Sequence, residues 1–434
     1  MNNPTKRDEI ASAAFVAWGE THFTSTSLNL VAQRLGITKQ ALYRHFRNKE
    51  ALLDELTERF LAAYAQIRDD VCVLPEDASL SEIVTQYADG VYRMFADVPH
   101  YYLFLVLRLL PGPAEVAGRF YAIGDEIGNR VLPHLDPSLP RAQIDLLMLF
   151  MHVHIVMWTA FDFWTPMGAL RGEPVGGRAR ERRVAHTVDL CLKGHFPHAR
   201  IPIDFEEVER FAVVDPSEML EPNRIFAAVE QVVQEVGFEA ASMDRIARAL
   251  GMTKSSLYFY FENKDAMLLE ALNRERRHMR SLFAARVEQL SRFSEMLYCY
   301  LVTMVTYFLN NRSLLVFSDW LTAQRVRVPD TVHDEQQILA TVDFVRRRLK
   351  LSQNPKRRKE VIETVALFSI LMYRGIADRG LSRENEDEAL AFTRDLYRTV
   401  THGIGPGTAT GAPVQGEEHR HPVTQGAAQK EGDE

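Results

Sequence analysis

The chain has 434 residues, of which 46% are hydrophobic and 25% charged, so its composition is that of an ordinary globular protein with roughly two to four domains. Its formal net charge of −7 at pH 7 argues against a protein that coats nucleic acid with its whole surface, while a local basic patch stays compatible with it. The cysteines Cys72, Cys191 and Cys299 lie far apart without disulfide or metal spacing, which favours reduced thiols in a cytosol.

No segment indicates secretion or membrane insertion. The first residues lack the apolar core of a signal peptide. The most apolar stretch, Leu146–Trp164, contains two histidines and an aspartate, so we expect a buried or subunit-facing helix there and not a membrane span. The sequence therefore predicts a cytoplasmic protein without a membrane partner.

Helical periodicity dominates the chain from its beginning. Thr5 and Asp8 have the spacing of a capping box, and an apolar stripe with helical spacing follows them. A second stripe follows Pro222, a residue that suits the first turn of a helix. No strand or hairpin signal is convincing, so we expect an all-α fold. The stripes comprise Ile10, Ala13, Ala14, Ala17 and Trp18, and then Ile225, Ala228, Val229, Val232, Val233 and Val236.

A basic and aromatic motif occurs twice. The first copy, GITKQALYRHFRNKEAL, begins at Gly36, and the second, GMTKSSLYFYFENKDAM, begins at Gly251, 215 positions later. A weaker echo relates AHTVDL at Ala185 to AFTRDL at Ala391, now 206 positions apart. Self-similarity over such a distance indicates two related units in one chain.

Each motif has capping and helix-ending residues at the positions that a helix-turn-helix requires. In the first copy, Ser27 can cap one helix, Gly36 can end it in a left-handed conformation, and Thr38 can cap the next. That second helix, 39–46, turns Leu42 and Phe46 inward and leaves a polar outer face. Asn48 then caps a third helix with Lys49 in its first turn, a placement suited to a phosphate. The second copy repeats these features.

The polar outer faces are the candidate DNA contacts, because Lys and Tyr suit phosphates and Gln40 and Arg44 can read base edges. A helix-turn-helix used only for packing is the alternative, and it is weaker for the first copy than for the second. The candidates of the first copy are Ser27, Thr38, Lys39, Gln40, Tyr43, Arg44, His45 and Lys49, and those of the second are Ser242, Thr253, Lys254, Ser255, Tyr258, Phe259, Tyr260 and Lys264.

The stretches LGITKQALYRHFRNKEALL and LGMTKSSLYFYFENKDAML resemble the signature of the TetR/AcrR family of bacterial transcriptional regulators. The resemblance implies, in each unit, a three-helix DNA-binding domain followed by a helical ligand-binding and dimerisation domain. It also implies a double-stranded DNA operator, a small-molecule effector and, most often, repression. The tandem is a departure, since family members usually carry one reader, that is, one DNA-binding helix-turn-helix, per chain.

We therefore divide the chain into two tandem units. The expected parts are a first helix-turn-helix domain at 1–55, its helical domain at 56–200, a linker at 201–220, a second helix-turn-helix domain at 221–270, its helical domain at 271–403 and a disordered tail at 404–434. The resemblance places the dimer interface on 141–164 with 182–196 and on 356–374 with 387–402. An intrachain pseudo-dimer is the economical arrangement, and a homodimer with four readers is the other.

The two readers differ in charge. Arg34, Lys39, Arg44, Arg47 and Lys49 surround the first, whereas the second has fewer cations and more acids. We expect a two-half-site operator with non-identical half-sites, the first bound more strongly. The alternative is an interaction or ligand-sequestering protein in which one or both modules no longer bind DNA.

The resemblance implies that effector pockets lie in the helical domains, where apolar side chains predominate. For any single candidate, packing in the core is the stronger reading. The candidates are Tyr101, His152, Trp158, Phe161 and Trp164 in the first unit and Tyr300, Tyr307, Trp320 and Tyr373 in the second.

No residue pattern indicates catalysis, a cofactor or a metal. His152 and His154 point about 200° apart on a helix and cannot chelate one ion. No phosphate-binding glycine loop and no nucleophile motif occur, so we expect a protein that is not an enzyme.

Overall fold

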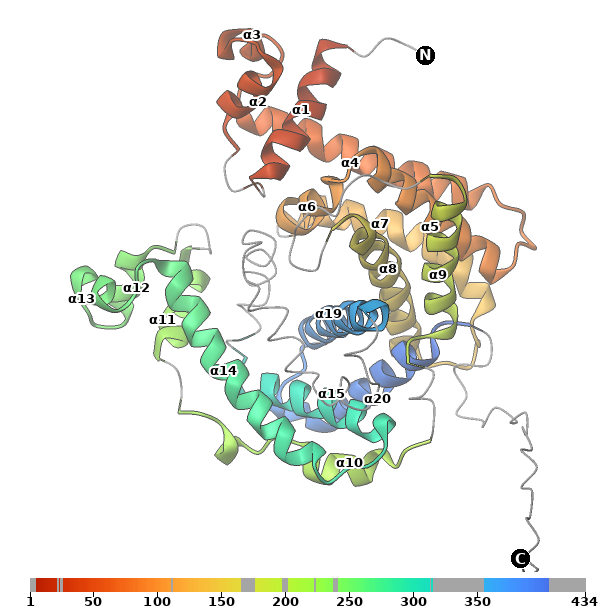
Figure 1. Cartoon of the computed structure of the whole chain (residues 1–434), viewed down its shortest axis with the longest axis vertical. Helices are drawn as coiled ribbons and strands as arrows, with labels where there is room; N and C mark the ends of the chain where they lie inside the picture. Colours follow the sequence, from red (N-terminus) through yellow and green to blue (C-terminus); the bar gives the residue numbers. More distant parts are fainter. Residues whose placement is uncertain are drawn as a thin grey trace, which may run out of the picture.

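In the computed structural model, the described residues are 5–405 except 22, 24–25, 111, 165–175, 197–201, 222–223, 237–240, 313 and 315–354. Within these ranges the protein consists of helices joined by turns and contains no strand, which confirms the all-α prediction. Figure 1 shows the two small three-helix groups at the ends of the long helices α4 and α14, with the remaining helices between them. The predicted tail from 406 onward lies outside the described residues.

The first three-helix group contains α1 (Lys6–Glu20), α2 (Leu28–Leu35) and α3 (Lys39–Tyr43), and α4 (Lys49–Cys72) continues from it into the helical body. The predicted caps are confirmed: Ser27, Thr38 and Asn48 each accept a backbone N–H with their side chain, and Thr5 forms its capping box. Gly36 ends α2 with φ 63°, the left-handed conformation that glycine tolerates.

The first helical body contains α5 (Leu80–Asp97), α6 (Tyr101–Phe104), the π-helix η1 (Leu105–Leu109), α7 (Ala114–Val131), α8 (Arg141–Phe163) and α9 (Gly177–Lys193). An aromatic cluster joins it to the first three-helix group. The ring of Phe15 on α1 lies 4.8 Å from that of Tyr101 and 5.4 Å from that of Phe104, while Phe60 on α4 lies 5.4 Å from Tyr101. These ring contacts therefore pack α6 directly against α1 and α4.

The second unit repeats this order with α11 (Arg224–Val236), α12 (Met243–Ala249), α13 (Lys254–Tyr260) and α14 (Lys264–Val287). Its body is built from α15 (Phe293–Asn310), α19 (Pro355–Asp378) and α20 (Glu386–His402). The N-caps Ser242, Thr253 and Asn263 are confirmed, and Gly251 has φ 70°. The two units therefore share local devices as well as sequence.

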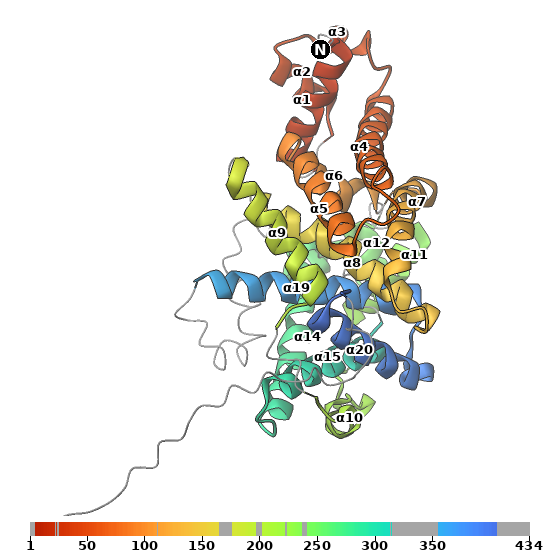
Figure 2. The same cartoon turned by 90° about the vertical axis from the view of Figure 1, so that its right-hand side faces the viewer.

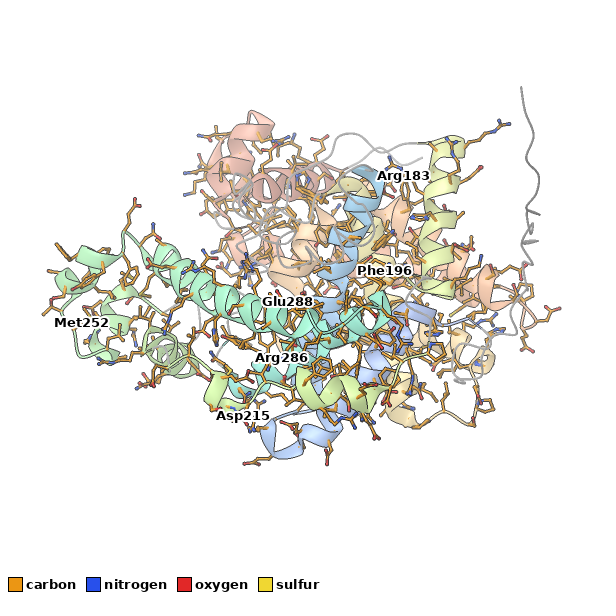
Figure 3. All side chains as sticks on the ribbon, turned by 60° about the horizontal axis from the view of Figure 1, so that its bottom comes forward. Arg183, Phe196, Asp215, Met252, Arg286 and Glu288 are labelled. Carbon is orange, nitrogen blue, oxygen red and sulfur yellow. The ribbon has the colours of Figure 1, made fainter. Side chains whose placement is uncertain are left out.

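The segment that we expected to be a linker contains a helix, α10 (Phe205–Ala212), followed by a 3-10 turn at Pro216–Glu218. Arg286, at the end of α14, binds both α10 and this 3-10 turn. Its guanidinium donates to the carbonyls of Ala212 at 3.2 Å and Val213 at 3.1 Å and to the carboxylate of Glu218 at 2.7 Å. It thereby satisfies carbonyls at a helix end that have no partner within the helix. Figure 3 shows Arg286 and Asp215 together at the base of α14.

Glu209 fastens α10 to the second body. Its side chain is buried, accepts from Tyr298 on α15, and forms a paired ion contact with Arg394 on α20, whose Nε lies 2.7 Å from Oε1. The guanidinium partner compensates a buried carboxylate that would otherwise be costly. The connection between the two units is thus part of the second core.

Helices α8, α9, α19 and α20 pack together and join the two units. Figure 2 shows α8, α19 and α20 crossing in the middle of the protein. We call this four-helix contact the seam. Of the described helices, α8 is the one long and apolar enough to cross a membrane by length and composition. Because 67% of its apolar window is buried by other parts of the protein, α8 is accounted for as a core helix.

Two glycines meet at the seam in a reciprocal arrangement. Gly194 follows α9 with φ 75° and Gly403 follows α20 with φ 77°. The N–H of His195 donates to the carbonyl of Val400 at 2.7 Å, and that of Ile404 donates to the carbonyl of Cys191 at 3.0 Å. In both cases the residue after the glycine binds the carbonyl three residues before the other glycine. Each helix end is therefore capped by the other unit.

This contact corrects the start of the predicted tail. Ile404 is buried, and the N–H of Gly405 donates to the carbonyl of Leu192 at 2.9 Å, so both residues belong to the folded body. The composition of the tail concealed them because their partners lie about two hundred residues earlier in the chain.

A chain of hydrogen bonds between neutral side chains also crosses the seam. His154 Nε2 donates to the carbonyl of Thr187 at 2.9 Å, so its Nδ1 accepts from His195 Nε2 at 3.3 Å, and His195 Nδ1 accepts from Thr364 on α19 at 3.0 Å. Burial lowers the pKa of His154 to about 4 and that of His195 well below its usual value. Protonation of His154 at Nδ1 would set its N–H against the N–H of His195 Nε2, and protonation of His195 at Nδ1 would end its acceptance from the Thr364 hydroxyl.

Alanine at Gly403 should destabilise the protein. A Cβ there would lie 2.5 Å from the carbonyl oxygen of Cys191 and 2.6 Å from the nitrogen of Gly194, in addition to the strain of a positive φ. We expect Gly403→Ala to lower the free energy of unfolding by about 1–3 kcal/mol more than Gly380→Ala. Gly380 is the matched control, since its φ is 60° and no atom lies within 4 Å of a Cβ. Urea unfolding measures both, and equal losses would refute the seam contact.

Acid should weaken the seam. The folded chain holds His154 with a pKa of about 4, while the unfolded value is about 6.5, so the unfolded chain binds a proton that the folded chain does not. The free energy of unfolding should fall as the pH drops from about 6.5 to about 4, by up to about 1.4 kcal/mol per pH unit for each such histidine. Urea unfolding at several pH values measures the slope. His154→Gln should reduce the slope by the share of one histidine, because His152 and His195 remain, whereas His45→Gln on the exposed surface is the control. Identical slopes in all three proteins would contradict the expectation.

Candidate nucleic-acid interface and cavity

The side chains on the outer face of α3 are exposed to solvent. Leu42 and Phe46 are buried beneath it, and the predicted contact residues on it are exposed. The ammonium of Lys39 lies 5.7 Å from the centre of the Tyr43 ring, which fixes the two side chains beside each other. The exposed residues of the first copy are Ser27, Thr38, Lys39, Gln40, Tyr43, Arg44, His45 and Lys49.

The cations of the first reader are not equally free. Arg34 forms a double hydrogen bond with Glu20 at 2.8 and 2.9 Å, and Lys49 lies 3.9 Å from Glu50. For Lys39 and Arg44, which lie on or at the end of α3, the structure gives no carboxylate partner within the described ranges. These two residues are therefore the strongest candidates for contact with an acidic surface.

Arg7 is a supporting residue that the sequence did not single out. Its guanidinium lies 4.3 Å from the centre of the Phe46 ring, donates to the carbonyl of His45 at 3.1 Å and pairs with Glu55 on α4. It therefore holds the end of α3 against α1 and α4. No local motif could reveal it, because its partners lie 38 to 48 residues away.

The second reader presents the same frame with a different surface. Its exposed residues include Lys254, whose ammonium lies 5.8 Å from the Tyr258 ring, as in the first reader. Lys264 is half-buried and donates to the carbonyl of Ala241 at 3.0 Å, which directs its ammonium into the domain. The exposed candidates are Ser242, Thr253, Lys254, Ser255, Tyr258, Phe259 and Tyr260.

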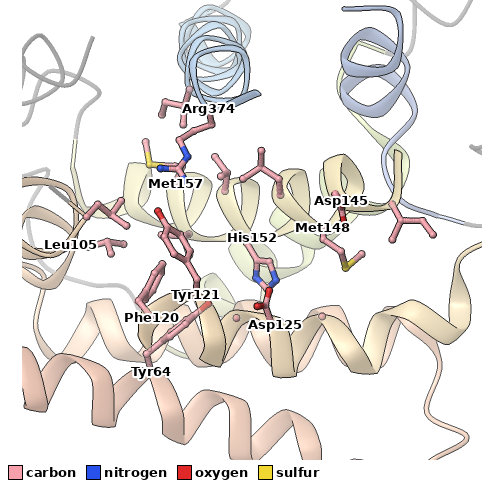
Figure 4. Close-up of a pocket in the computed structure, with 18 of the residues that line it drawn as sticks. Tyr64, Leu105, Phe120, Tyr121, Asp125, Asp145, Met148, His152, Met157 and Arg374 are labelled. Carbon is pink, nitrogen blue, oxygen red and sulfur yellow. The ribbon is translucent and has the colours of Figure 1, made fainter. Parts of the chain in front are cut away.

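A cavity of about 570 Å³ lies in the first body against the seam (Figure 4). α4, η1, α7 and α8 form most of its wall, and Ile370 and Arg374 of α19 contribute from the second unit. The Arg374 guanidinium lies 5.4 Å from the centre of the Tyr121 ring on α7. The lining is mostly apolar with a few polar groups, as in small-molecule sites. Its apolar part includes Leu105, Val106, Phe120, Met148, Val153 and Met157.

Three polar side chains form a chain beside this cavity. His152 Nδ1 lies 3.1 Å from the hydroxyl of Tyr87, which lies 2.8 Å from that of Tyr64. His152 Nε2 is buried and has no hydrogen-bond partner among the described residues, and it lies close to Gly124 and Gly128 on α7. Burial lowers the pKa of His152 to about 4, so the ring is neutral at pH 7. A buried polar atom without a partner is costly, and it marks this point of the cavity wall.

Of the predicted ligand residues, His152 alone among those described lines the cavity. Trp158 packs on His195 in the seam, and the indole of Trp164 donates to the carbonyl of Pro99 at 2.8 Å. Tyr101 belongs to the aromatic cluster at α1, and Phe161 is buried beside Trp158.

In the second unit, the predicted candidates are packed in the core. Tyr300 lies against Phe283, Tyr307 donates to Glu275 at 2.7 Å, and Tyr373 packs on Phe308. Trp320 lies outside the described residues.

The sequence analysis missed four residues that line the cavity, namely Tyr64, Gly124, Gly128 and Arg374, and also the buried Tyr87 behind His152. The spacing of the two glycines, one helical turn apart, was the available signal. As for metals, no group of three or more His, Cys, Asp or Glu side chains that could hold an ion occurs among the described residues.

Comparisons with known proteins identify the two reader domains. The family model described as "Bacterial regulatory proteins, tetR family" matches residues 10–56 and 225–271. The HTH-type transcriptional repressor KstR2 of Mycobacterium tuberculosis is 24% identical over 187 residues, which cover 40% of this chain and 88% of that protein. The crystal structure of SCO4942 from Streptomyces coelicolor matches with 18% identity and a TM-score of 0.30 over 42% of this chain and 96% of that one. With two matches to the family model on two helix-turn-helix groups, the chain is a tandem member of the TetR family of transcriptional regulators.

Proposed function

We propose that this protein is a cytoplasmic, ligand-responsive repressor whose two non-identical readers bind the two half-sites of one DNA operator. The observation that carries the proposal is the outer face of α3, where Lys39, Gln40, Tyr43 and Arg44 are exposed together on a helix held rigidly from beneath. A cationic and amide-bearing helix face of this kind suits phosphates and base edges of a major groove.

The seam supports a pseudo-dimer within one chain. Two helix-turn-helix readers must lie about 34–36 Å apart, or a multiple of this distance, to reach successive major grooves. Reciprocal capping at Gly194 and Gly403 provides a fixed point between the units, and the continuous helices α4 and α14 lead from the bodies to the readers. A covalent link presents the second reader at high effective concentration once the first is bound.

The cavity supports a route for ligand response. Leu105 and Val106 line it from η1, which continues directly from α6, and α6 carries the aromatic contacts to Phe15 on α1. The ring of His100, at the start of α6, lies so close to Gly19 that a side chain there would collide with it. A ligand that displaces η1 therefore changes the tilt of the first reader. It regulates DNA binding to the extent that it binds one tilt better than the other.

Arg44→Ala should weaken DNA binding without affecting folding. We expect a loss of about 1–3 kcal/mol of binding free energy, because an exposed guanidinium on the reading face loses its base contact.

Lys49→Ala should weaken binding evenly across DNA sequences and reduce the slope of log affinity against log salt concentration by about 1. Fluorescence anisotropy with an operator selected from random DNA measures both.

Arg119→Ala is the matched control. Arg119 is an exposed arginine on α7 that pairs with Glu58, away from either reader, so its loss should leave the affinity for DNA unchanged. If Arg44→Ala and Arg119→Ala lost the same DNA affinity, the effect would come from net charge and not from a contact of Arg44. If the wild-type protein selects no DNA at low salt, the interaction or ligand-sequestering alternative replaces the proposal.

Filling the cavity should uncouple ligand response from DNA binding. Val153 lines the cavity from α8, and Val153→Trp should occupy its apolar volume. Compounds are first selected by thermal shift. A ligand at about 100 times its Kd should raise the free energy of unfolding of the wild type by about 2.7 kcal/mol and release the operator. The variant should bind the operator as before and respond to neither test. Val73→Trp, at an exposed site, should respond like the wild type, and an equal response in Val153→Trp would place the ligand elsewhere.

A further inference from the structure

Three consecutive aromatic side chains project from the end of α13. Tyr258 is 45% exposed, Phe259 84% and Tyr260 66%, and the rings of Phe259 and Tyr260 lie 5.3 Å apart edge to face. On the corresponding helix of the first reader, α3, Tyr43 is the one large aromatic side chain that is exposed among the described residues, at 44%. Covering a side chain such as Phe259 is favourable in water, so this surface gains free energy when a partner buries it.

The register of the repeat identifies the kind of partner. The offset of 215 residues that aligns the two motifs places Phe259 at the position of Arg44 and Tyr260 at that of His45. One turn earlier, the lysine and tyrosine pair is kept in nearly the same geometry, at 5.7 and 5.8 Å. The supporting frame of the first reader is therefore retained, while the residue at the position of the predicted base contact Arg44 has changed from cationic to apolar.

The charges around the second reader point in the same direction. Arg248 is paired with Asp244, and Lys264 donates to a carbonyl of its own domain, so both contribute less to phosphate binding than their number suggests. Weak neutralisation of phosphates leaves apolar contact as a larger share of the affinity at this half-site, and phosphate contacts carry no sequence information. The one apolar group on a base edge in the major groove is the C5-methyl group of thymine.

We propose that Phe259 is a specificity-determining residue that recognises thymine methyl groups, so that the second half-site carries thymine where the first carries the base read by Arg44. This inference rests on the proposed function, since it requires that both readers bind DNA. Tyr258 and Lys254 position the helix on the backbone, and Phe259 covers the methyl group.

The test uses the full chain and an operator selected from random DNA. Synthetic operators then carry deoxyuridine in place of thymidine, which removes the C5-methyl group alone. In the second half-site, this change should weaken wild-type binding about fourfold per contacted methyl group, the effect of losing one buried CH₂-sized group. Phe259→Ala should already have lost this affinity and should show no further loss, which is the signature of a coupled pair in a double-mutant cycle.

Two controls make the result specific. Phe259→Leu keeps an apolar contact and should retain most of the sensitivity to deoxyuridine, and deoxyuridine in the first half-site should weaken the wild type and Phe259→Ala equally. Folding is not at stake, because Phe259 is almost fully exposed.

Equal deoxyuridine effects in the second half-site for the wild type and Phe259→Ala would overturn the inference while leaving the proposed function intact. Protection of a single half-site, or self-association of the chain that Phe259→Ala abolishes, would also overturn it. Failure to select any DNA would remove both proposals.

Discussion

The arrangement of the two units depends on the close approach of two helix ends. α9 and α20 each leave their last turn through a glycine with positive φ, and each following N–H caps a carbonyl of the other helix. A Cβ at either glycine would occupy the space of the opposite backbone, so no other residue allows this distance. The buried chain of hydrogen bonds from the carbonyl of Thr187 through the two histidines to the Thr364 hydroxyl lies along the same seam. Together with the packing of α8 on α19 and α20, this contact joins the two bodies from which α4 and α14 lead to the readers.

Local features could be predicted from the sequence, and distant contacts could not. The caps Ser27, Thr38 and Asn48 act within three residues of themselves, so their neighbours in the chain were sufficient. By contrast, Glu209 binds Arg394, 185 residues later. Because the segment around Glu209 is rich in proline and charged residues, the sequence alone predicts a linker there. The helix could be predicted only if the distant partner of Glu209 were known. Aromatic residues posed a related difficulty, because a core and a pocket use the same side chains, and packing alone separates Trp158 from His152.

The two readers differ in chemistry on a shared frame. A homodimer must read the same sequence twice, because one surface serves both subunits and its interface is symmetric. Once two units are joined in one chain, each can change without affecting the other. The lysine and tyrosine pair is retained in both readers. Arg44 and His45 of the first reader correspond to Phe259 and Tyr260 of the second. The positions that support the helix are thus constrained by folding, and those that face outward are constrained only by their target.

Helix α8 connects the cavity with the seam. His152 and His154 are two residues apart and point about 200° apart, so the first faces α7 and the cavity, while the second faces α9 and reaches Thr364 of the other unit through His195. Because α8 is packed on both sides, a rotation of α8 would disturb the hydrogen bond between His154 and His195. Under the proposed function, a ligand beside His152 would act on two connections at once, through η1 to the first reader and through α8 to the seam. Its effect on DNA affinity would then depend on the difference in its binding to the two arrangements of these helices, and not on its affinity as such.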